Sequence, residues 1–426
     1  MTVREELYNG INIQKPWPPR MKEKEQALKK NIDRIPETIC YLSNPPKVIP
    51  IHVGRQLFVD DFLIDTSTLQ RKYYYPEPYV GNPILKPQTK IEKNEGCCPV
   101  AATFTDGVFY DSKDGLYKMW YQAGWFDGTA YAESLDGQNW YRPDLDVVPG
   151  TNMVLPFRKG YKRDGATVWI DHETKDPKSR YKLFVFFRKN EVEEIGELYI
   201  SSDGIHWNGP TITGPCGDAS SFFYNPFRKK WVFSIRKVDV EGDFHYRYRQ
   251  YYETEDFLKG ADWGRNDPVF WYGADDLDKK HAIYDCTTQL YGVDCVAYES
   301  ILLGAFEIFK GPHNRIAEEL GVPKQCDITL GYSRDGFHFC RPDRTAFLKG
   351  SEKKGTWDYG YIHASGGLCI VEKDQLRFYY SAWSGESPKY GKHMYAGGAT
   401  GYATLRRDGF ASVAAEKEGF LKTRVL

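Results

Sequence analysis

The sequence has no long hydrophobic run and no excess of one charge sign. None of its 426 residues lies in an apolar stretch of about 18, the length of a membrane-spanning helix, so we expect no membrane partner. Lysine and arginine total 57 against 58 acidic residues, which argues against a nucleic-acid partner because such proteins display a basic face. The first twenty residues lack the apolar core of a signal peptide, which predicts a cytoplasmic protein, or a secreted one if a signal was removed.

Cysteine patterns typical of metal or disulfide sites are also missing. The nine cysteines are scattered, their number is odd, and no C-x-x-C pair occurs. This pattern favours buried, reduced thiols over a zinc site or a disulfide framework. Reduced thiols also fit a reducing compartment.

Aromatic residues, in contrast, are abundant. They make up 15% of the chain, with 31 tyrosines and 11 tryptophans. Aromatic side chains favour β-strands and also form surfaces that stack on sugar rings. The composition therefore favours a sheet protein and suits a carbohydrate partner.

A short motif, S-x-D-G-x-x-W, recurs along the chain. It reads S-L-D-G-Q-N-W from Ser134, S-S-D-G-I-H-W from Ser201 and S-R-D-G-F-H-F from Ser333, with a shorter copy, R-R-D-G-F, from Arg406. Asp can accept a bond from the backbone two residues on and Gly can adopt a positive φ, so the motif predicts a tight turn between strands. We expect a structural role for its four aspartates, Asp136, Asp203, Asp335 and Asp408.

The order of strands and turns predicts the fold. Each unit reads as strand, turn, strand, loop, strand, motif turn and strand, and five such units follow one another, the third keeping only Asp262-Trp263 of the motif. Four antiparallel strands repeated five times are typical of a propeller. We therefore predict an all-β fold, a five-bladed β-propeller of four-stranded antiparallel blades, over residues 51–426. The strand before Asp60 is a candidate for completing the last blade and closing the ring.

Residues 1–50 are predicted to form an N-terminal arm with one short helix. The helix is expected over 21–35, where Leu28 and Ile32 belong to a narrow apolar stripe, and Pro36 ends it. So narrow a stripe needs a surface to lie on. That surface is either the helix's own domain or a neighbouring subunit, which would make the protein a homo-oligomer. A further helical turn is expected in the polar insertion around 311–325.

Several segments resemble the five-bladed β-propeller glycoside hydrolases, the broad group of families 32, 43, 68, 117 and 130. The segments are LFVDDFLI (57–64), NPIL (82–85), YKMWY (117–121), YAESLDGQNWYRP, GDASSFFYNP and ATLRRDGF. The short W-x-N-D-P signature of the fructan-cleaving members is absent, so a fructosidase activity is not implied. The resemblance implies a carbohydrate substrate and a glycoside hydrolase acting on a small or terminal glycan.

Glycosidic cleavage needs two carboxyl groups, one protonated and one charged. The resemblance implies a third carboxylate that orients the others. Asp164 and Asp218 each lie three residues before an inner strand of successive units, and Glu299 ends V-A-Y-E-S in the fourth. We predict this set as catalytic, with the glutamate as acid by family analogy; the alternative for each is a turn cap or an ion pair.

Further residues are predicted to bind substrate because they fall near the same strand starts. Arginines could bind a sugar carboxylate or neutralise an acid, and aromatic rings could stack on a sugar, although packing between blades would use the same rings. His363 could bind substrate, hold a structural metal ion in the central channel as in some relatives, or be a hydrogen-bonded core residue. No cofactor is expected to be required. The predicted binding residues are Arg163, Arg236, Asp285, Asp358, His363, Trp125 and Trp357, with Tyr361, Glu92 and Glu95 in comparable loops.

Three alternatives remain open. A phosphorylase or transglycosidase could use the same fold, and a phosphorylase needs a cationic phosphate pocket beside the acid. A non-catalytic glycan-binding propeller would have stacked aromatics but no two acids within about 10 Å of each other. A protein-interaction propeller would carry a Trp-Asp repeat signature, which is absent here.

Overall fold

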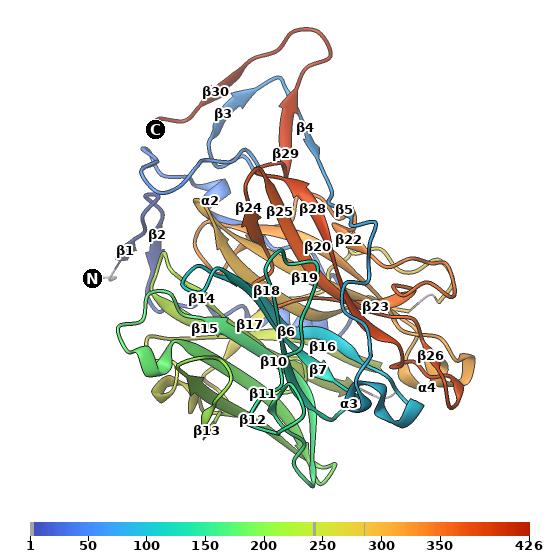
Figure 1. Ribbon diagram of the computed structural model, residues 1–426. Coiled ribbons are helices and arrows are strands. Elements are labelled where there is room, and N and C mark those ends of the chain that lie inside the picture. The colour runs from blue at the N-terminus through green and yellow to red at the C-terminus, as the bar shows by residue number, and fades with distance from the viewer. Residues whose placement is uncertain (1–3, 242–243, 285) are drawn as a thin grey trace.

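A computed structural model describes residues 4–241, 244–284 and 286–426 of the chain. Within these ranges, five antiparallel sheets stand in a ring as a five-bladed β-propeller (Figure 1). Blades one and two comprise β6 (Ala101–Asp111), β7 (Leu116–Ala123), β8 (Gly128–Ser134) and β9 (Met153–Leu155), then β10 (Tyr161–Ile170), β11 (Tyr181–Lys189), β12 (Glu193–Ser201) and β13 (Asn208–Ile212). Blade three comprises β14 (Ser221–Asn225), β15 (Lys230–Glu241), β16 (Phe244–Thr254) and β17 (Val269–Gly273).

The last two blades are more elaborate. Blade four comprises β18 (Gln289–Tyr298), β19 (Ile301–Gly311) and β20 (Gln325–Ser333), which pairs with both β21 (Phe339–Cys340) and β22 (Leu348–Lys349). Blade five comprises β23 (Gly360–Ala364), β24 (Ile370–Glu372), β25 (Gln375–Trp383), β28 (Gly398–Arg406) and β5 (Glu77–Pro78). The first strand of each blade, β6, β10, β14, β18 or β23, faces the central axis.

Segments from the two ends of the chain close the ring. The outer strand β5 pairs with β28, where Glu77 lies opposite Thr404. The sequence prediction placed the closing strand before Asp60, and this is wrong, because residues 51–59 form no strand; the buried Asp60 carboxylate instead binds the Arg334 guanidinium at 2.9 Å. Beyond the blades, β29 (Ala411–Ala414) pairs with β4 (Gln70–Tyr73), and β30 (Leu421–Thr423) pairs with β3 (Ile64–Ser67).

Helices are short and few in the described ranges. They are α1 (Lys22–Lys29), α2 (Cys40–Ser43), α3 (Lys90–Lys93) and α4 (Asn314–Leu320), with 3-10 turns at Asn94–Gly96, Pro177–Ser179 and Lys259–Ala261. The remaining strands are β1 (Arg4–Glu6), β2 (Asn12–Gln14), β26 (Glu386–Ser387) and β27 (Gly391–Lys392). No helix among the described residues has the length and apolarity needed to cross a bilayer.

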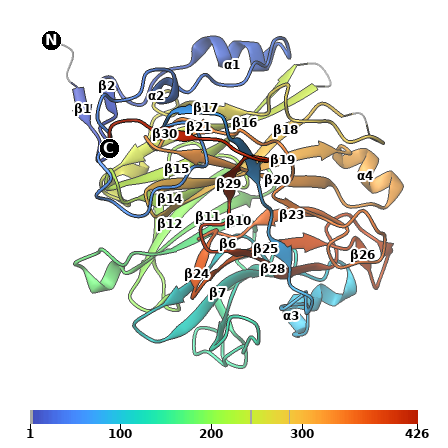
Figure 2. The same ribbon diagram turned by 90° about the horizontal axis from the view of Figure 1, so that it is seen from above.

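Helix α1 is shorter than the sequence predicts and lies on its own domain. Asn31 and Asp33 adopt positive φ angles of 51° and 47°, which end the helical conformation before Ile35. Helix α1 lies beside β17 (Figure 2), and Leu28 packs on Phe270 of that strand. The chain's own third blade therefore covers Leu28, whereas Ile32 and Ile35 of the predicted stripe are 57% and 63% exposed, and the contact with a neighbouring subunit stays a prediction.

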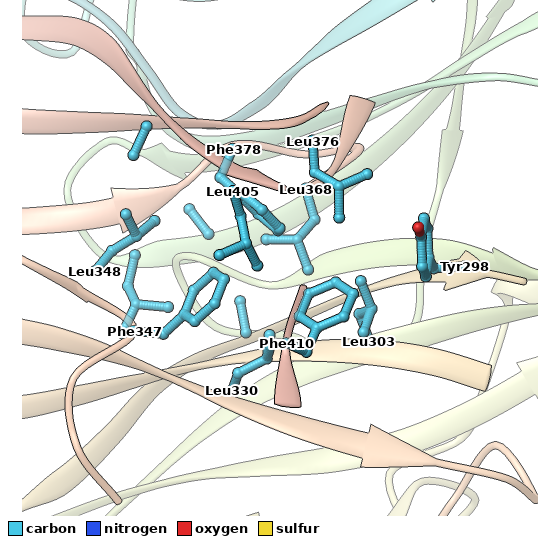
Figure 3. Close-up of a cluster of buried hydrophobic side chains, with 14 of the residues drawn as sticks. Tyr298, Leu303, Leu330, Phe347, Leu348, Leu368, Leu376, Phe378, Leu405 and Phe410 are labelled. Carbon is cyan, nitrogen blue, oxygen red and sulfur yellow. The ribbon is translucent and has the colours of Figure 1, made fainter. Parts of the chain in front are cut away.

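The hydrophobic core lies between the blades. Almost every residue of β19 is buried, because neighbouring blades cover both faces of its sheet. Between blades four and five, Leu303 and Leu330 meet Leu376 and Phe378, and Phe410 from the closing segment completes the cluster (Figure 3). This packing fixes the position of each inner strand relative to the next.

The recurrent motif forms the turn that the sequence predicts. In the first copy the Asp136 carboxylate accepts bonds from the backbone N–H groups of Gln138 and Asn139, both at 2.8 Å, and Ser134 Oγ accepts from Gly137 N–H at 2.9 Å. The copies at Ser201 and Ser333 repeat this pattern. Asp408 differs, since its carboxylate pairs with Arg55.

Each full motif turn also joins two blades. Trp120 of blade one donates its indole N–H to the carbonyl of Gly204 in blade two, at 2.7 Å. Trp271 of blade three donates in the same way to Phe337 of blade four at 2.8 Å. Tyr379 of blade five donates its hydroxyl to Gly137 of blade one at 2.8 Å. The motif therefore stabilises the ring as well as the turn.

Gly137→Ala is expected to destabilise the protein more than Gly115→Ala. Both glycines adopt positive φ angles, 70° and 69°, so both variants incur the left-handed cost of about 1–2 kcal/mol. A Cβ at Gly137 would lie 2.5 Å from the Tyr379 hydroxyl, whereas nothing lies within 4 Å at Gly115. Urea unfolding should show a further loss of about 1–3 kcal/mol for Gly137→Ala. Equal losses would mean that the turn does not hold the blades together.

Candidate functional site

A cavity of about 320 Å³ opens where the five inner strands begin. Each blade contributes a residue from, or just before, the start of its inner strand. These residues are Phe104, Asp164, Asp218, Tyr291 and Tyr361. The convergence of strand starts that the sequence predicts is therefore present, and it brings together side chains from all five blades.

Two carboxylates from neighbouring blades meet in this cavity. Asp164 lies in an irregular part of β10 between Arg163 and Ala166, and such bulges redirect side chains. A Cβ on the adjacent Gly165 would come within 2.9 Å of the Ala219 backbone, so glycine permits the close approach of β10 to the segment carrying Asp218. The backbone thus holds both acids at one side of the cavity.

Arginines pair with these carboxylates. The Nη2 atom of Arg188, at the end of β11, contacts Asp218 and lies 3.5 Å from Asp164. Arg236 of β15 also pairs with Asp218. Burial lowers the pKa of Arg236 to about 10, and the nearby Arg247 guanidinium adds to that effect. The two acids therefore share a site with several cations.

Aromatic rings also line the cavity. Trp125 from the β7–β8 turn stacks on Tyr395 with ring centroids 4.2 Å apart. Tyr361 lies 5.8 Å from Tyr395, and Tyr291 lies 6.2 Å from Tyr361. Such rings can stack on the apolar faces of a sugar.

His363 forms part of the cavity wall, and its position is fixed by hydrogen bonds to Glu307. Its Nδ1–H donates to the Glu307 carboxylate at 2.9 Å, and the other Glu307 oxygen accepts from the Ala364 N–H at 2.8 Å. Among the described residues no group of three or more His, Cys, Asp or Glu side chains is arranged to hold a metal ion. These contacts are the ones expected for the hydrogen-bonded alternative for His363.

Asp294→Asn is expected to change how stability depends on pH. Burial, with a further contribution from Glu307, raises the pKa of Asp294 from 3.8 to about 7. Between these values the unfolded chain loses a proton that the folded protein keeps, so this group makes wild-type stability fall as pH rises. The variant should lose less stability over that interval.

Thermal unfolding measured from pH 4 to pH 8 checks this expectation. Asp262→Asn, at an exposed position, serves as the control and should follow the wild-type pH profile. If both variants match the wild-type profile, Asp294 does not titrate in that range in the folded protein.

Other residues predicted from the sequence lie elsewhere. Glu299 follows the end of β18, whereas the cavity lies at the start of that strand, and its carboxylate pairs with Arg55 at 2.8 Å. The prediction that Glu299 lies with Asp164 and Asp218 is therefore wrong. The prediction failed because an acid after the last residue of an inner strand faces the opposite end of the ring.

The predicted binding residues divide into two groups. Arg236, His363 and Trp125 line the cavity, as does Tyr361. Asp285 lies outside the described residues. The others are absent from the cavity wall. Arg163 pairs with Asp106, Trp357 packs on Tyr380, and the backbone carbonyl of Asp358 accepts a hydrogen bond from the Ser351 N–H. Glu92 caps α3 and binds Arg142, and Glu95 is exposed.

The sequence prediction missed Arg188, Arg247, Lys324, Tyr291 and Tyr395. Arg188 had a detectable signal, because the runs F-V-F-F-R-K in β11 and V-F-S-I-R-K in β15 place Arg188 and Arg236 at matching points. Lys324 and Tyr395 come from insertions that the repeat does not contain, so no periodic signal marks them.

Comparison with solved structures agrees with the fold. A thermostable family-43 glycoside hydrolase matches with a TM-score of 0.51 and 14% identity, covering 78% of this chain and 97% of that chain. An N-acetylgalactosamine deacetylase from F. plautii, in complex with blood group B trisaccharide, matches with a TM-score of 0.50 and 15% identity, covering 79% of this chain and 95% of that chain. A glycosyl hydrolase from Bacteroides ovatus matches with a TM-score of 0.50 and 11% identity, covering 84% of this chain and 99% of that chain.

These likenesses confirm the five-bladed propeller that the sequence resemblance implied. At such low identity they show the fold alone, and a deacetylase among them illustrates that one fold can support different chemistry. Neither protein-family models nor curated proteins gave a match to the sequence. The residues of the cavity therefore provide the main indication of function.

Proposed function

We propose that the protein is a glycoside hydrolase that cleaves the glycosidic bond of a small or terminal glycan in this cavity. One observation carries the proposal: Asp164 and Asp218, from neighbouring blades, meet at the same Arg188 guanidinium. Glycosidic cleavage needs such a pair of carboxyl groups, and rings such as Trp125 can hold the sugar. The fold likeness to structures described as glycoside hydrolases supports the same function.

In this proposal Asp218 stays charged and Asp164 donates the proton. Arg188 and Arg236 both pair with Asp218, which suits a carboxylate that remains ionised. Asp164 contacts Arg188 only at 3.5 Å and is therefore the better candidate for the proton donor to the leaving oxygen.

The spacing of the two acids favours retention of anomeric configuration. Both carboxylates contact the same Nη2 atom, so their nearest oxygens lie closer than the roughly 6.5–9.5 Å typical of inverting pairs. Asp218 would then attack the anomeric carbon, the bond to the leaving oxygen would break as Asp164 protonates it, and water would release the sugar from Asp218.

The test is hydrolysis of a panel of aryl glycosides and oligosaccharides. Aglycone release reports turnover, and NMR of the first-formed product reports its anomeric configuration. We expect release without added phosphate and a product of unchanged configuration. An inverted product would contradict the role given to Asp218, and turnover unaffected by changing both acids would contradict the proposal.

A phosphorylase is the second candidate, because two cations of the cavity, Arg247 and Lys324, have no carboxylate within ion-pair distance among the described residues. Such cations could bind inorganic phosphate. A phosphorylase would turn over only with phosphate present and would release a sugar 1-phosphate. Parallel assays with and without phosphate distinguish the two candidates.

A further inference from the structure

Arg247 presents a guanidinium to the cavity that the protein only partly satisfies. Its Nη1 atom donates to Gln289 Oε1 at 2.6 Å. Its plane lies over the rings of Tyr291 and Phe309, 5.2 and 5.6 Å from their centroids. Its Nε atom is buried and has no hydrogen-bond partner among the described residues. The rings therefore hold in place a guanidinium whose side-chain hydrogen bond is to a neutral amide and which has no carboxylate within ion-pair distance among the described residues.

Lys324 reaches the same part of the cavity from the β19–β20 insertion. Its side chain is buried, and its Nζ donates to the Tyr395 hydroxyl at 2.8 Å. The ammonium also lies 5.6 Å from the Tyr291 centroid, so Lys324 and Arg247 share one aromatic neighbour. Burial, followed by the charges of Arg247 and Arg236, lowers the pKa of Lys324 to about 7.

This arrangement differs from the way the chain treats most other buried cations. Arg249 also forms no ion pair among the described residues, but its Nη1 donates hydrogen bonds to the carbonyls of Ala219 and Ser234. Seven further buried cations among the described residues touch a carboxylate, in the pairs Lys118–Asp111, Arg163–Asp106, Arg180–Asp111, Lys182–Asp171, Arg334–Asp60, Arg341–Asp278 and Arg377–Glu372. The half-buried Arg247 and the buried Lys324 thus form a cationic pair at an open volume.

The other charges of the cavity are already balanced. Lys162 pairs with Glu191 at 2.7 Å, and Arg188 and Arg236 pair with the two aspartates. Among the described residues that line the cavity, Arg247 and Lys324 remain, and two neighbouring cations partly withdrawn from water repel unless an anion lies between them. We propose that this anion is the carboxylate of a uronic acid, so that the substrate is an acidic glycan bound through Arg247 and Lys324. This assignment rests on the proposed glycosidase function.

A sugar carboxylate fits the site better than a phosphate does. A phosphate would leave the aromatic rings beside the two cations without a partner, whereas a uronate brings a sugar ring together with its charge. The planar guanidinium can bind a carboxylate in a bidentate manner, as it can a phosphate, so the rings decide between the two anions. The tyrosine rings around the two cations would meanwhile contact the pyranose ring that carries the carboxylate.

Calorimetric titration tests this site without relying on turnover. The probes are glucuronate and galacturonate, the neutral sugars glucose and galactose, and inorganic phosphate. The wild-type protein should bind at least one uronate roughly tenfold to a hundredfold more tightly than its neutral counterpart, as expected for a hydrogen-bonded ion pair. Arg247→Met and Lys324→Met should each reduce that preference, by weakening uronate binding more than neutral-sugar binding.

Lys162→Met is the matched control, because it removes a charge at the cavity that Glu191 already neutralises. This variant should keep the preference for uronate. Equal binding of uronate and neutral sugar, binding of phosphate alone, or an equal loss in the Lys162 variant would overturn the assignment.

The outcomes also separate this inference from the proposed function. A uronate preference that disappears in Arg247→Met, together with failure to cleave any glycoside, would overturn the hydrolase but support the carboxylate site. Cleavage of neutral glycosides without any uronate preference would overturn the carboxylate site and support the hydrolase.

Discussion

Asp218→Asn is expected to reduce glycoside turnover by about a thousandfold or more, because it removes the charged carboxylate of the pair. Asparagine keeps the size of the side chain, so Arg188 and Arg236 should keep a neighbour of similar shape. Asp164→Asn should cause a loss of similar size on substrates with poor leaving groups, since protonation of the leaving oxygen is then essential. The measurement is kcat/KM for each variant on a matched series of aryl glycosides.

The leaving group separates the two roles. Asp164→Asn should recover much of its activity on a dinitrophenyl glycoside, whose leaving oxygen needs no proton, and Asp218→Asn should not. Asp218→Ala should regain turnover with added azide or formate, which can replace the missing carboxylate. Glu299→Gln provides the control, because Glu299 lies at the other end of β18 and pairs with Arg55. A loss in that variant equal to those at the two aspartates would contradict the site assignment.

Arg163→Met is expected to destabilise the folded protein by about 3–5 kcal/mol. Arg163 and Asp106 form a fully buried ion pair, and Arg163 also donates to the Asp164 carbonyl at 2.7 Å. Without Arg163, the Asp106 carboxylate would stay buried with no countercharge. Urea unfolding at neutral pH measures the loss.

Two observations distinguish this mechanism from simple loss of packing. The double variant Arg163→Met with Asp106→Leu should recover most of the stability, because replacing a buried pair by apolar residues is often neutral. Burial already raises the pKa of Asp106 to about 6, and Arg163 opposes that rise. The single variant should therefore be less damaging at pH 5, where a protonated Asp106 is more easily buried, than at pH 8. Additive losses in the double variant would contradict the mechanism.

The propeller could be predicted from the sequence because its elements repeat. The Asp-Gly turn occurs at one place in each unit, and the same local hydrogen bonds form at Ser134, Ser201 and Ser333. Ring closure was harder to predict. Glu77–Pro78 is only two residues long and contains proline, so β5 has almost no strand signal, and only its pairing with β28 defines it.

The candidate site was predictable only where it follows the repeat. Asp164 and Asp218 occupy matching positions before two inner strands, and both lie in the cavity. Arg247 lies near the start of β16, and Lys324 and Tyr395 lie in insertions in blades four and five. Their proximity depends on how five blades pack around an axis, which no local pattern encodes.

The pairing of β5 with β28 has a consequence for the order of folding. Thr404 must be synthesised before Glu77 can find its partner, so the ring stays open until nearly the whole chain has left the ribosome. Contacts between such distant segments form slowly because of the entropy of closing a long loop. Until then β28 presents an unpaired edge, a template for aggregation. Once docked, Pro78 lacks an N–H group, which limits pairing by a further strand. Closure of the ring is therefore expected to complete the cavity and to protect its last open edge in a single late step.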